Sequence, residues 1–488
     1  FDLIIIGGGV VGCAIAREAS KYRLKILLIE KEPDVAEGIS KANSGVLHAG
    51  FNVLPDSLKA RFNVEGLNIC PTLAEELDVE YRITKKLVVG KSDSDLPYLE
   101  NLLTRGKSNG CSGLSIIGEQ QIRRLEPQAR GKWALLSETT GIISPFQFTI
   151  ALAENAAENG VEFMLNTAVT GINTLTGSSF RLTTAGSDGG TSTLDCRFLV
   201  NSAGMNAASV KSMVEPHDTR VYPCRGEYYI TDKEDGKLLG MPVYPVPPAD
   251  GSGLGVHLTP TCNGNILIGP SADYLEDEED LANTAGVMAQ LKKEAFELMP
   301  ELEGHAFIRS YSGMRPKLFT KESGTGFADF IIEESDNFPG MINLMGIESP
   351  GLTSAPAIAK YVVEELLCPK TELIPKLSYN PRRKGIKRSS HLTEAERRAL
   401  AAKDPDYAEI ICRCEQVSRA EILQAIHNPL GALSLGAIKK RTYSMMGRCQ
   451  SGFCLPRIIE IICEETGCSP ASILQTGKGS GVLTGSLD

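Results

Sequence analysis

Four cysteines in the C-terminal part of the sequence have the types and spacing of metal ligands. They follow the pattern C-x-C, then 34 residues, then C-x4-C, and are Cys412, Cys414, Cys449 and Cys454. Four thiolates suit a [2Fe–2S] cluster or zinc, but structural zinc loops usually open with C-x2-4-C, so the single residue between the first two ligands favours the cluster. The glycines of GRCQSGFC would let the backbone wrap around an inorganic core. Buried thiols without a ligating role are the remaining interpretation.

A glycine-rich segment at the other end of the chain predicts a dinucleotide site. The apolar run at residues 3–6, the segment GGGVVGCAIA and the apolar KILLIE indicate a strand, a tight turn, a helix and a second strand. Gly7 permits the turn, Gly9 lets the backbone approach a pyrophosphate, and Gly12 lets the helix pack on the strand. The helix N-terminus offers N–H groups to phosphate, and Glu30 would accept from a ribose hydroxyl. This motif alone leaves FAD and NAD both open.

Composition limits the class of protein. With 488 residues, of which 42% are hydrophobic, we expect a globular chain of two or three domains. The net charge of −10 argues against nucleic acid as a partner, and an anionic substrate would need a locally basic pocket. The first predicted strand begins at residue 2, and no run of about 18 apolar residues could span a bilayer. Thirteen cysteines without a secretory leader indicate reduced thiols, so we expect a cytoplasmic protein without a transmembrane segment.

Later segments favour FAD through a resemblance. VEFMLNTAVTGI (161–172) and FLVNSAGMNA (198–207) resemble the later strands of the glutathione-reductase-type FAD fold. FPGMINLMGIESPGLTSAPAIAKYV (338–362) indicates a strand, a glycine-rich loop and a helix whose N-terminus could stabilise negative charge on a reduced flavin. The implied fold class is α/β with an α+β cap: a Rossmann-like FAD domain, an interleaved antiparallel-sheet substrate domain, and a small helical C-terminal iron–sulfur domain.

Taken together, residues 1 to about 370 resemble the D-amino-acid-oxidase-like flavoprotein superfamily, in its branch of glycerol-3-phosphate and L-2-hydroxyglutarate dehydrogenases. The most specific marker is NSGVLHAGFNVLPDSLKARFNVEG (43–66), which is similar to the family segment that carries a histidine beside the flavin ring. IICRCEQVS (410–418) and KKRTYSMMGRCQSGFC (439–454) resemble the bacterioferritin-associated-ferredoxin-like module of the anaerobic glycerol-3-phosphate dehydrogenase large subunit. The cofactors implied are FAD and a [2Fe–2S] cluster. The FAD contacts implied are Gly7, Gly9, Gly12, Glu30, Ser44, Gly45, Val169, Ala203, Gly204, Gly346, Gly351, Leu352 and Thr353.

The same resemblance implies a catalytic role for His48. Oxidation of a secondary alcohol requires removal of the hydroxyl proton while hydride leaves carbon, and an imidazole with a pKa near ~6.5 suits that proton transfer at neutral pH. Only six histidines occur in the chain. Lys59 and Arg61, further along the same segment, are expected on a solvated helix face.

The marks of substrate identity conflict. SGMRPK (312–317) and GIESPGLTSAP (346–356) resemble the glycerol-3-phosphate type, which implies that Arg315 acts in catalysis and that Ser349 holds the substrate. YPVPPADGSGLGVHLTP (244–260) resembles the hydroxyglutarate type and places His257 where a lysine able to hold phosphate would be expected. Arg225 is a further candidate for binding the substrate, because its planar fork suits a carboxylate or a phosphate.

The leading functional hypothesis is an FAD-dependent sn-glycerol-3-phosphate dehydrogenase. Hydride would pass from C2 of the alcohol to flavin N5, giving dihydroxyacetone phosphate, and electrons would leave through the [2Fe–2S] centre. The alternatives are L-2-hydroxyglutarate dehydrogenase and a non-catalytic electron-transfer subunit. The expected partners are a small anionic alcohol and electron-accepting subunits, a second flavoprotein or an iron–sulfur protein, through which the chain could associate peripherally with a membrane.

The predicted domains are discontinuous in sequence. The FAD domain is expected at 1–85, 141–220 and 320–370, and the substrate-binding cap at 86–140 and 221–319. A linker at 371–408 contains the basic run PRRKGIKRSS, for which a solvated face is expected, and it precedes the [2Fe–2S] domain at 409–475 and a tail at 476–488.

Overall fold

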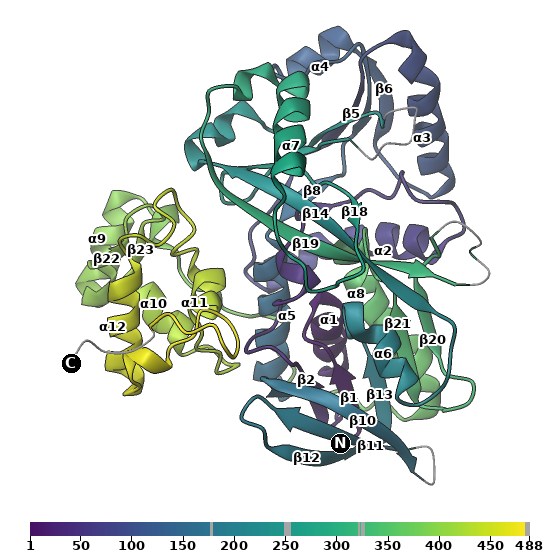
Figure 1. The fold of residues 1–488 in the computed structure, drawn as a ribbon, viewed down its shortest axis with the longest axis vertical. Coiled ribbons are helices and arrows are strands. Elements are labelled where there is room, and N and C mark those ends of the chain that lie inside the picture. The colour runs from purple at the N-terminus through teal and green to yellow at the C-terminus, as the bar shows by residue number, and fades with distance from the viewer. Residues whose placement is uncertain (176–178, 248–254, 321–322, 324–326, 484–488) are drawn as a thin grey trace.

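The structure is a computed structural model that describes residues 1–175, 179–247, 255–320, 323 and 327–483. Figure 1 shows a lower body that contains the N-terminus, an upper body, and a smaller C-terminal body drawn in yellow to one side. Residues 484–488 of the expected tail, and 248–254 of the segment quoted at 244–260, lie outside the described part.

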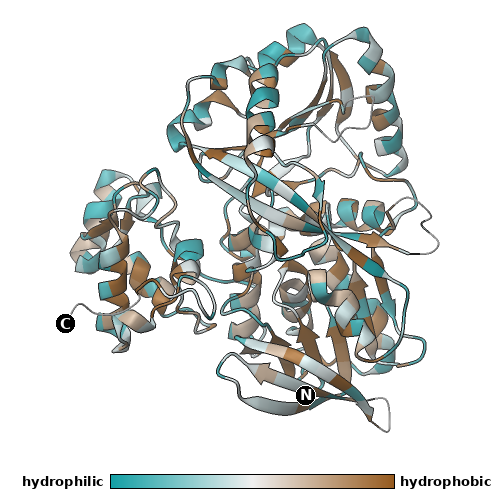
Figure 2. Cartoon of the chain, in the orientation of Figure 1, coloured by the Kyte–Doolittle hydropathy of each residue, from teal (hydrophilic) through white to brown (hydrophobic). Residues whose placement is uncertain are grey.

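A six-stranded sheet forms the centre of the lower body. Its order is β20-β21-β13-β1-β2-β9, and its neighbours are parallel except for β20. The strands are β1 (Leu3–Ile6), β2 (Ile26–Ile29), β9 (Glu162–Met164), β13 (Phe198–Asn201), β20 (Ile331–Glu334) and β21 (Met341–Met345). Figure 2 shows these strands as predominantly hydrophobic.

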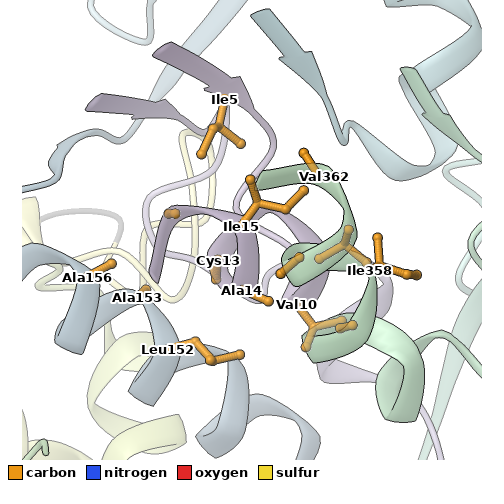
Figure 3. Packing of buried hydrophobic residues seen from close by; sticks show 14 of the residues in the cluster. Ile5, Val10, Cys13, Ala14, Ile15, Leu152, Ala153, Ala156, Ile358 and Val362 are labelled. Atoms are coloured by element: carbon orange, nitrogen blue, oxygen red, sulfur yellow. The ribbon is translucent and has the colours of Figure 1, made fainter. Parts of the chain in front are cut away.

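Both faces of this sheet are covered, which explains why β1 is apolar at every position rather than alternating. Leu3 and Ile5 pack against helices, whereas Ile4 and Ile6 pack against a second, three-stranded sheet. Figure 3 shows Ile5 over Ile15, with side chains of three helices around them. The helices are α1 (Val10–Ala19), α5 (Pro145–Glu158) and α8 (Gly351–Tyr361), the last continuing as a π-helical segment (Val362–Leu367). The second sheet is β10 (Thr167–Leu175), β11 (Ser179–Gly186) and β12 (Thr191–Cys196).

Helix α2 (Leu58–Glu76) lies across α8 at close range. Gly66 makes this approach possible, because a Cβ at that position would lie 2.0 Å from the carbonyl oxygen of Thr353. Beside α2 is a small sheet in the order β3-β8-β4. Its strands are β3 (Val46–Leu47), β4 (Tyr81–Ile83) and β8 (Gly141–Ile143), and a short helix α6 (Ala207–Ser212) follows β13.

The upper body is built on a mostly antiparallel sheet. Its order is β18-β14-β17-β16-β15-β5-β7-β6, and β19 pairs along β14 from Arg220↔Phe319 to Thr231↔Phe307. The strands are β5 (Lys86–Gly90), β6 (Leu114–Gly118), β7 (Trp133–Ser137), β14 (Arg220–Thr231), β15 (Val243–Pro245), β16 (Leu258–Pro260), β17 (Ile266–Ile268), β18 (Asp273–Tyr274) and β19 (Phe307–Phe319). Its helices are α3 (Leu96–Ser108), α4 (Glu119–Leu125) and α7 (Ala285–Leu298).

The C-terminal body has a hydrophobic core of its own, centred on Ile422, Ile438 and Ile458. Its elements are α9 (Glu394–Lys403), β22 (Ile410–Cys412), β23 (Val417–Ser418), α10 (Arg419–Ile426), α11 (Leu435–Thr442) and α12 (Leu455–Thr466). The α/β fold class with its antiparallel cap and small helical C-terminal body is therefore confirmed, while the residue boundaries of the domains stay predictions. None of the described helices is both long and apolar enough to cross a bilayer.

Buried ion pairs attach the C-terminal body to the lower body. The guanidinium of Arg441, on α11, lies 2.6 Å from Asp34 and 2.8 Å from Glu154. Glu154 also pairs with Arg383 at 2.6 Å. Arg383 belongs to the basic run of the linker and is only 9% exposed, so the expectation of a solvated face is wrong at this position.

Candidate active site

A cavity of about 890 Å³ lies between the six-stranded sheet and the upper body. The structure brings many of the predicted site residues together in the wall of this cavity. Predicted residues that line it are Gly7, Gly9, Glu30, Ser44, Gly45, His48, Ala203, Gly204, His257, Arg315, Ser349, Gly351 and Leu352. The structure does not bring Gly12, Val169, Arg225, Gly346 or Thr353 to the cavity wall.

At one end the cavity has the features of a dinucleotide site. Gly7 has φ +105°, and a Cβ there would lie 2.6 Å from the carbonyl oxygen of Ser202, so the turn after β1 requires glycine. The Glu30 carboxylate, at the end of β2, accepts hydrogen bonds from the N–H groups of Gly8 at 2.6 Å and Glu32 at 2.9 Å. Burial is the largest influence on Glu30 and raises its pKa. A bare glycine turn, a helix N-terminus and a carboxylate beyond the second strand fit the pyrophosphate and ribose of FAD.

Three of the predicted residues that do not line the cavity pack next to residues of the surrounding structure. A Cβ at Gly12 would lie 2.1 Å from the carbonyl oxygen of Gly7, so this glycine lets α1 pack against the turn. Gly346 has φ +69° and lies against Leu318. The hydroxyl of Thr353 accepts a hydrogen bond from the backbone N–H of His48 at 2.9 Å.

Arg225 and Val169 have other surroundings. The Arg225 side chain is buried, and its guanidinium lies 2.8 Å from Asp280 and 3.3 Å from Glu227. Its charge is therefore compensated within the upper body. Val169 lies at a bulge in β10 and packs against the core between the two sheets of the lower body.

His48 lies in the cavity wall just after β3, and its backbone is fixed from two sides. Besides the bond to Thr353, its carbonyl oxygen accepts from the side-chain amide of Asn63 on α2. Burial, and after it the charge of Lys86, lower the pKa of His48 to about 3. The imidazole is therefore neutral near pH 7, which is the state in which a proton acceptor must begin.

Lys86 is a residue of this site that the sequence reasoning missed. Its side chain begins β5, is 3% exposed and lines the cavity. The ammonium lies 3.3 Å from the centre of the Tyr244 ring, and Tyr244 stacks on His257 with 3.4 Å between ring centres. The segment KKLVVG contained a signal for this. Side chains two positions apart on a strand point to the same face, so Lys86 could have been expected on the same buried face as Val88.

A second group of charges surrounds Glu348, which precedes Ser349. The carboxylate of Glu348 accepts from Lys59 at 3.0 Å and from Lys317 at 2.7 Å. The expectation that Lys59 is solvated is wrong, because its side chain is 16% exposed and lines the cavity, whereas Arg61 is 44% exposed as expected. Arg315, on β19, donates to the carbonyl oxygen of Ser271 and has no carboxylate partner in the described part of the chain.

The four predicted cluster ligands form two pairs of thiols. Cys412 is hydrogen bonded to Cys454, and Cys414 to Cys449. The backbone N–H groups of Glu415 and Met445 donate to Cys412. The bond between these two thiols lowers the pKa of Cys412 and raises that of Cys454.

Across the described residues, no three or more His, Cys, Asp or Glu side chains converge as ligands of a single metal ion. Two separate thiol pairs do fit a two-iron cluster, because its four thiolates are shared between the irons, two on each. Gly447 leaves room for this arrangement, since a Cβ there would lie 2.2 Å from the Cβ of Cys414.

Known proteins with similar sequences and structures cover both parts of the chain. Residues 2–365 match the family described as FAD dependent oxidoreductase (DAO), and residues 410–464 match the BFD-like [2Fe-2S] binding domain. A glycerol 3-phosphate dehydrogenase of Caloramator mitchellensis is 39% identical, over 99% of this chain and 98% of its own. A mitochondrial L-2-hydroxyglutarate dehydrogenase of Arabidopsis thaliana is 31% identical, over 75% of this chain and 83% of its own. The structure of a dithionite-reduced L-alpha-glycerophosphate oxidase from Mycoplasma pneumoniae with FAD bound has a TM-score of 0.71 at 29% identity, covering 78% of this chain and 98% of that one.

Proposed function

The chain belongs to the FAD-dependent oxidoreductase family, and from this premise we propose that it oxidises sn-glycerol 3-phosphate to dihydroxyacetone phosphate and passes the electrons to its C-terminal domain. Its cofactors are FAD and a [2Fe–2S] cluster, and both family resemblances drawn from the motifs are confirmed. When bound, FAD accepts a hydride from the carbinol carbon, and a [2Fe–2S] cluster takes up electrons singly.

The substrate assignment is carried by the likeness to the Caloramator mitchellensis glycerol 3-phosphate dehydrogenase, which extends over 99% of this chain. The match to the L-2-hydroxyglutarate dehydrogenase of Arabidopsis thaliana covers 75% of this chain. The cavity suits an anionic alcohol, because Arg315 and Lys86 line it without a described carboxylate partner.

Within the cavity we assign the proton transfer to His48. Its neutral imidazole takes the hydroxyl proton, and the backbone that carries the ring is fixed because its N–H donates to Thr353 and its carbonyl oxygen accepts from Asn63. Arg315 presents a planar fork to the anionic group, and Ser349, which also lines the cavity, offers a hydroxyl. Lys59 and Lys317 fix the loop that carries Ser349 by holding Glu348 from two sides.

A packed route connects the cavity wall with the cluster ligands, and it supports an electron outlet through the C-terminal domain. Gly45 lies against Ile143 and Pro145, whose neighbour Phe146 meets the ring of Tyr443 at 5.5 Å between ring centres. Two residues beyond Tyr443, the backbone N–H of Met445 donates to Cys412 and to Cys454.

We further propose that the electrons continue to a partner subunit, a second flavoprotein or an iron–sulfur protein, which could hold the chain at a membrane. Phe453, between two cluster ligands, is 79% exposed and could meet such a partner. The cytoplasm is the proposed compartment, because none of the thirteen cysteines, all of which lie in the described part of the chain, forms a disulfide.

The main alternative is oxidation of L-2-hydroxyglutarate. His257 favours it, because this position has a histidine in place of a lysine whose fixed positive charge would hold a phosphate. A non-catalytic electron-transfer subunit is disfavoured, because His48, Arg315 and Ser349 line one cavity.

The deciding experiment is anaerobic stopped-flow absorbance of the purified chain, mixed separately with sn-glycerol 3-phosphate and with L-2-hydroxyglutarate. Fast loss of the flavin band with the phosphate, followed by a change in the cluster band, is expected. Bleaching by L-2-hydroxyglutarate alone would transfer the assignment to the 2-hydroxy acid, and no bleaching by either compound would contradict both.

A further inference from the structure

We propose that Lys86, held against Tyr244 and beside His48, is a binding site for the anionic group of the substrate, acting together with Arg315. This inference rests on the proposed function, since it concerns an anionic alcohol bound in the same cavity. The chemistry recognised is that of a phosphate monoester, or of a carboxylate if the 2-hydroxy acid is the substrate.

Lys86 is an exception among the buried cations of the described chain. Six Lys or Arg side chains there are less than a tenth exposed. Five of them pair with a carboxylate: Arg17 with Glu76, Arg225 with Asp280, Arg383 with Glu154, Lys440 with Glu37 and Arg441 with Asp34. Lys86 has no carboxylate within ion-pair distance in the described residues. A buried charge is costly unless it is paired, so a lone buried ammonium that faces a cavity either gives up its proton or pairs with an anion from outside the chain.

The position of Lys86 directs its side chain into the cavity. Successive side chains of β5 point to opposite faces, and Lys86 and Val88 line the cavity whereas Leu87 and Val89 pack in the core with α7. Neighbouring strands β7 and β15 hold β5 on both sides. The ammonium is therefore held on a rigid element rather than on a loop.

The contacts of the ammonium stabilise it without neutralising it. It lies 3.3 Å from the centre of the Tyr244 ring and 5.3 Å from that of Phe51. Aromatic faces attract a cation through their quadrupole and leave its net charge in place. That charge remains available to a ligand that enters the cavity.

An anion at Lys86 would also affect the proposed base. The charge of Lys86 is, after burial, the second cause that lowers the pKa of His48. A substrate anion paired with Lys86 offsets this charge and so strengthens His48 as a proton acceptor when substrate is present. Binding of the anion and readiness of the base are thus coupled through one lysine.

The test compares Lys86→Met with wild-type holoenzyme, and uses Lys85→Met as the matched control. Lys85 is the adjacent lysine, its side chain is 42% exposed, and it lies 3.6 Å from Glu138. Two quantities are measured anaerobically: the sn-glycerol 3-phosphate concentration that half-saturates the rate of flavin bleaching, and the dissociation constant of inorganic phosphate, titrated against the absorbance of the oxidised flavin. FAD content and cluster absorbance report whether each variant is folded.

Lys86→Met is expected to raise both concentrations by about 10- to 100-fold, the loss expected from a hydrogen bond to a charged group, with little change in the rate at saturation. Lys85→Met should match wild type. Lys86→Gln supplies a second neutral side chain if the Met variant loses FAD, and the same increase is expected.

The proposal is overturned if both concentrations are unchanged in the neutral variants. It is also overturned if only the saturating rate falls, because Lys86 would then act as a proton acceptor. Failure of the proposed function has a different signature, in which sn-glycerol 3-phosphate does not bleach even the wild-type flavin. The phosphate titration, which needs no turnover, then decides the role of Lys86.

Discussion

His48 and Lys86 both line the cavity, and the charge of Lys86 opposes protonation of His48. His48→Ala should retain FAD, because the bonds to Thr353 and Asn63 involve the backbone of this residue and not its ring. Loss of a general base typically slows the chemical step by about 10²- to 10⁴-fold. The rate of flavin bleaching at saturating substrate measures this effect.

The matched control is His427→Ala, whose side chain is 63% exposed on the C-terminal body and pairs with Glu465. It should bleach at the wild-type rate. Equal rates in wild type and His48→Ala would remove His48 from the proton transfer.

Substrate binding should weaken as the pH rises, with Lys86 as the titrating group. Burial lowers the pKa of Lys86 to about 7, so its charged form is present below that pH and is lost above it. The other titratable groups that face the Lys86 ammonium are His48, Tyr244 and His257. The pKa of His48 is far below that of Lys86, and burial raises the pKa of Tyr244. Once the pH exceeds the pKa of Lys86, the half-saturating concentration of substrate should therefore rise about tenfold per pH unit.

This pH dependence is measured by stopped-flow reduction of the flavin from about pH 6 to about pH 9, with the ionic strength held constant. In Lys86→Met the rise should be absent. A rise that persists in the variant would assign the titration to another group.

At the scale of elements, α11 joins the two halves of the molecule. Arg441 is 3% exposed and bridges Asp34 and Glu154, which lie on the FAD domain. Removal of one partner of a buried ion pair typically costs about 3–5 kcal/mol, because the remaining charges stay buried without compensation. Arg441→Met should lower the free energy of local opening of α11 by this amount, which hydrogen exchange of its amides measures.

Arg457→Met, on α12 of the same body, is the control. Arg457 also pairs with glutamates, but at the surface, where such pairs contribute about 1 kcal/mol or less. If both variants exchange equally, the buried pairs of α11 do not hold the C-terminal body in place.

The loop between α11 and α12 carries two of the predicted cluster ligands, Cys449 and Cys454. Cys449→Ser should abolish the visible absorbance of the cluster and leave substrate-driven bleaching of the flavin intact, because Cys449 lies outside the cavity wall. Absorbance and iron content of the purified variant measure the first effect.

Cys463→Ser tests whether the loss is specific. The sulfur atoms of Cys463 and Cys468 lie 3.9 Å apart, and neither belongs to the predicted ligand set. Its cluster absorbance should equal that of wild type. Persistence of the cluster in Cys449→Ser would mean that the ligand set is wrong.

At the scale of the whole molecule, the sequence predicted the elements near the cofactor better than the charges around the substrate. The turn at Gly7 and the carboxylate of Glu30 follow from local patterns, because strand, turn and helix are adjacent in the chain. The fold class and FAD were predicted from the resemblance of longer segments to a known family, and the [2Fe–2S] cluster from the spacing of four cysteines.

The remaining charges depend on contacts between segments that are far apart in sequence. Lys59 is held by Glu348, 289 residues later. Arg225 is compensated by Asp280, 55 residues later. The residues next to Arg225 and Lys59 in sequence do not indicate these distant carboxylate partners. The sequence alone therefore could not show that Arg225 is already paired or that Lys59 is not solvated.

The segment after the C-terminal core returns to the FAD domain. Thr476 lines the cavity, and Gly477 lies beside Glu32, close to the strand end that carries Glu30. The backbone N–H of Gly436, on α11, donates to the carbonyl oxygen of Gln475, so this segment is attached to the iron–sulfur body. During translation the FAD domain emerges first, with this part of the wall still missing and the groove open to the flavin. Folding of the C-terminal body then brings this segment to the groove, so the cavity wall is completed only after that body has been made.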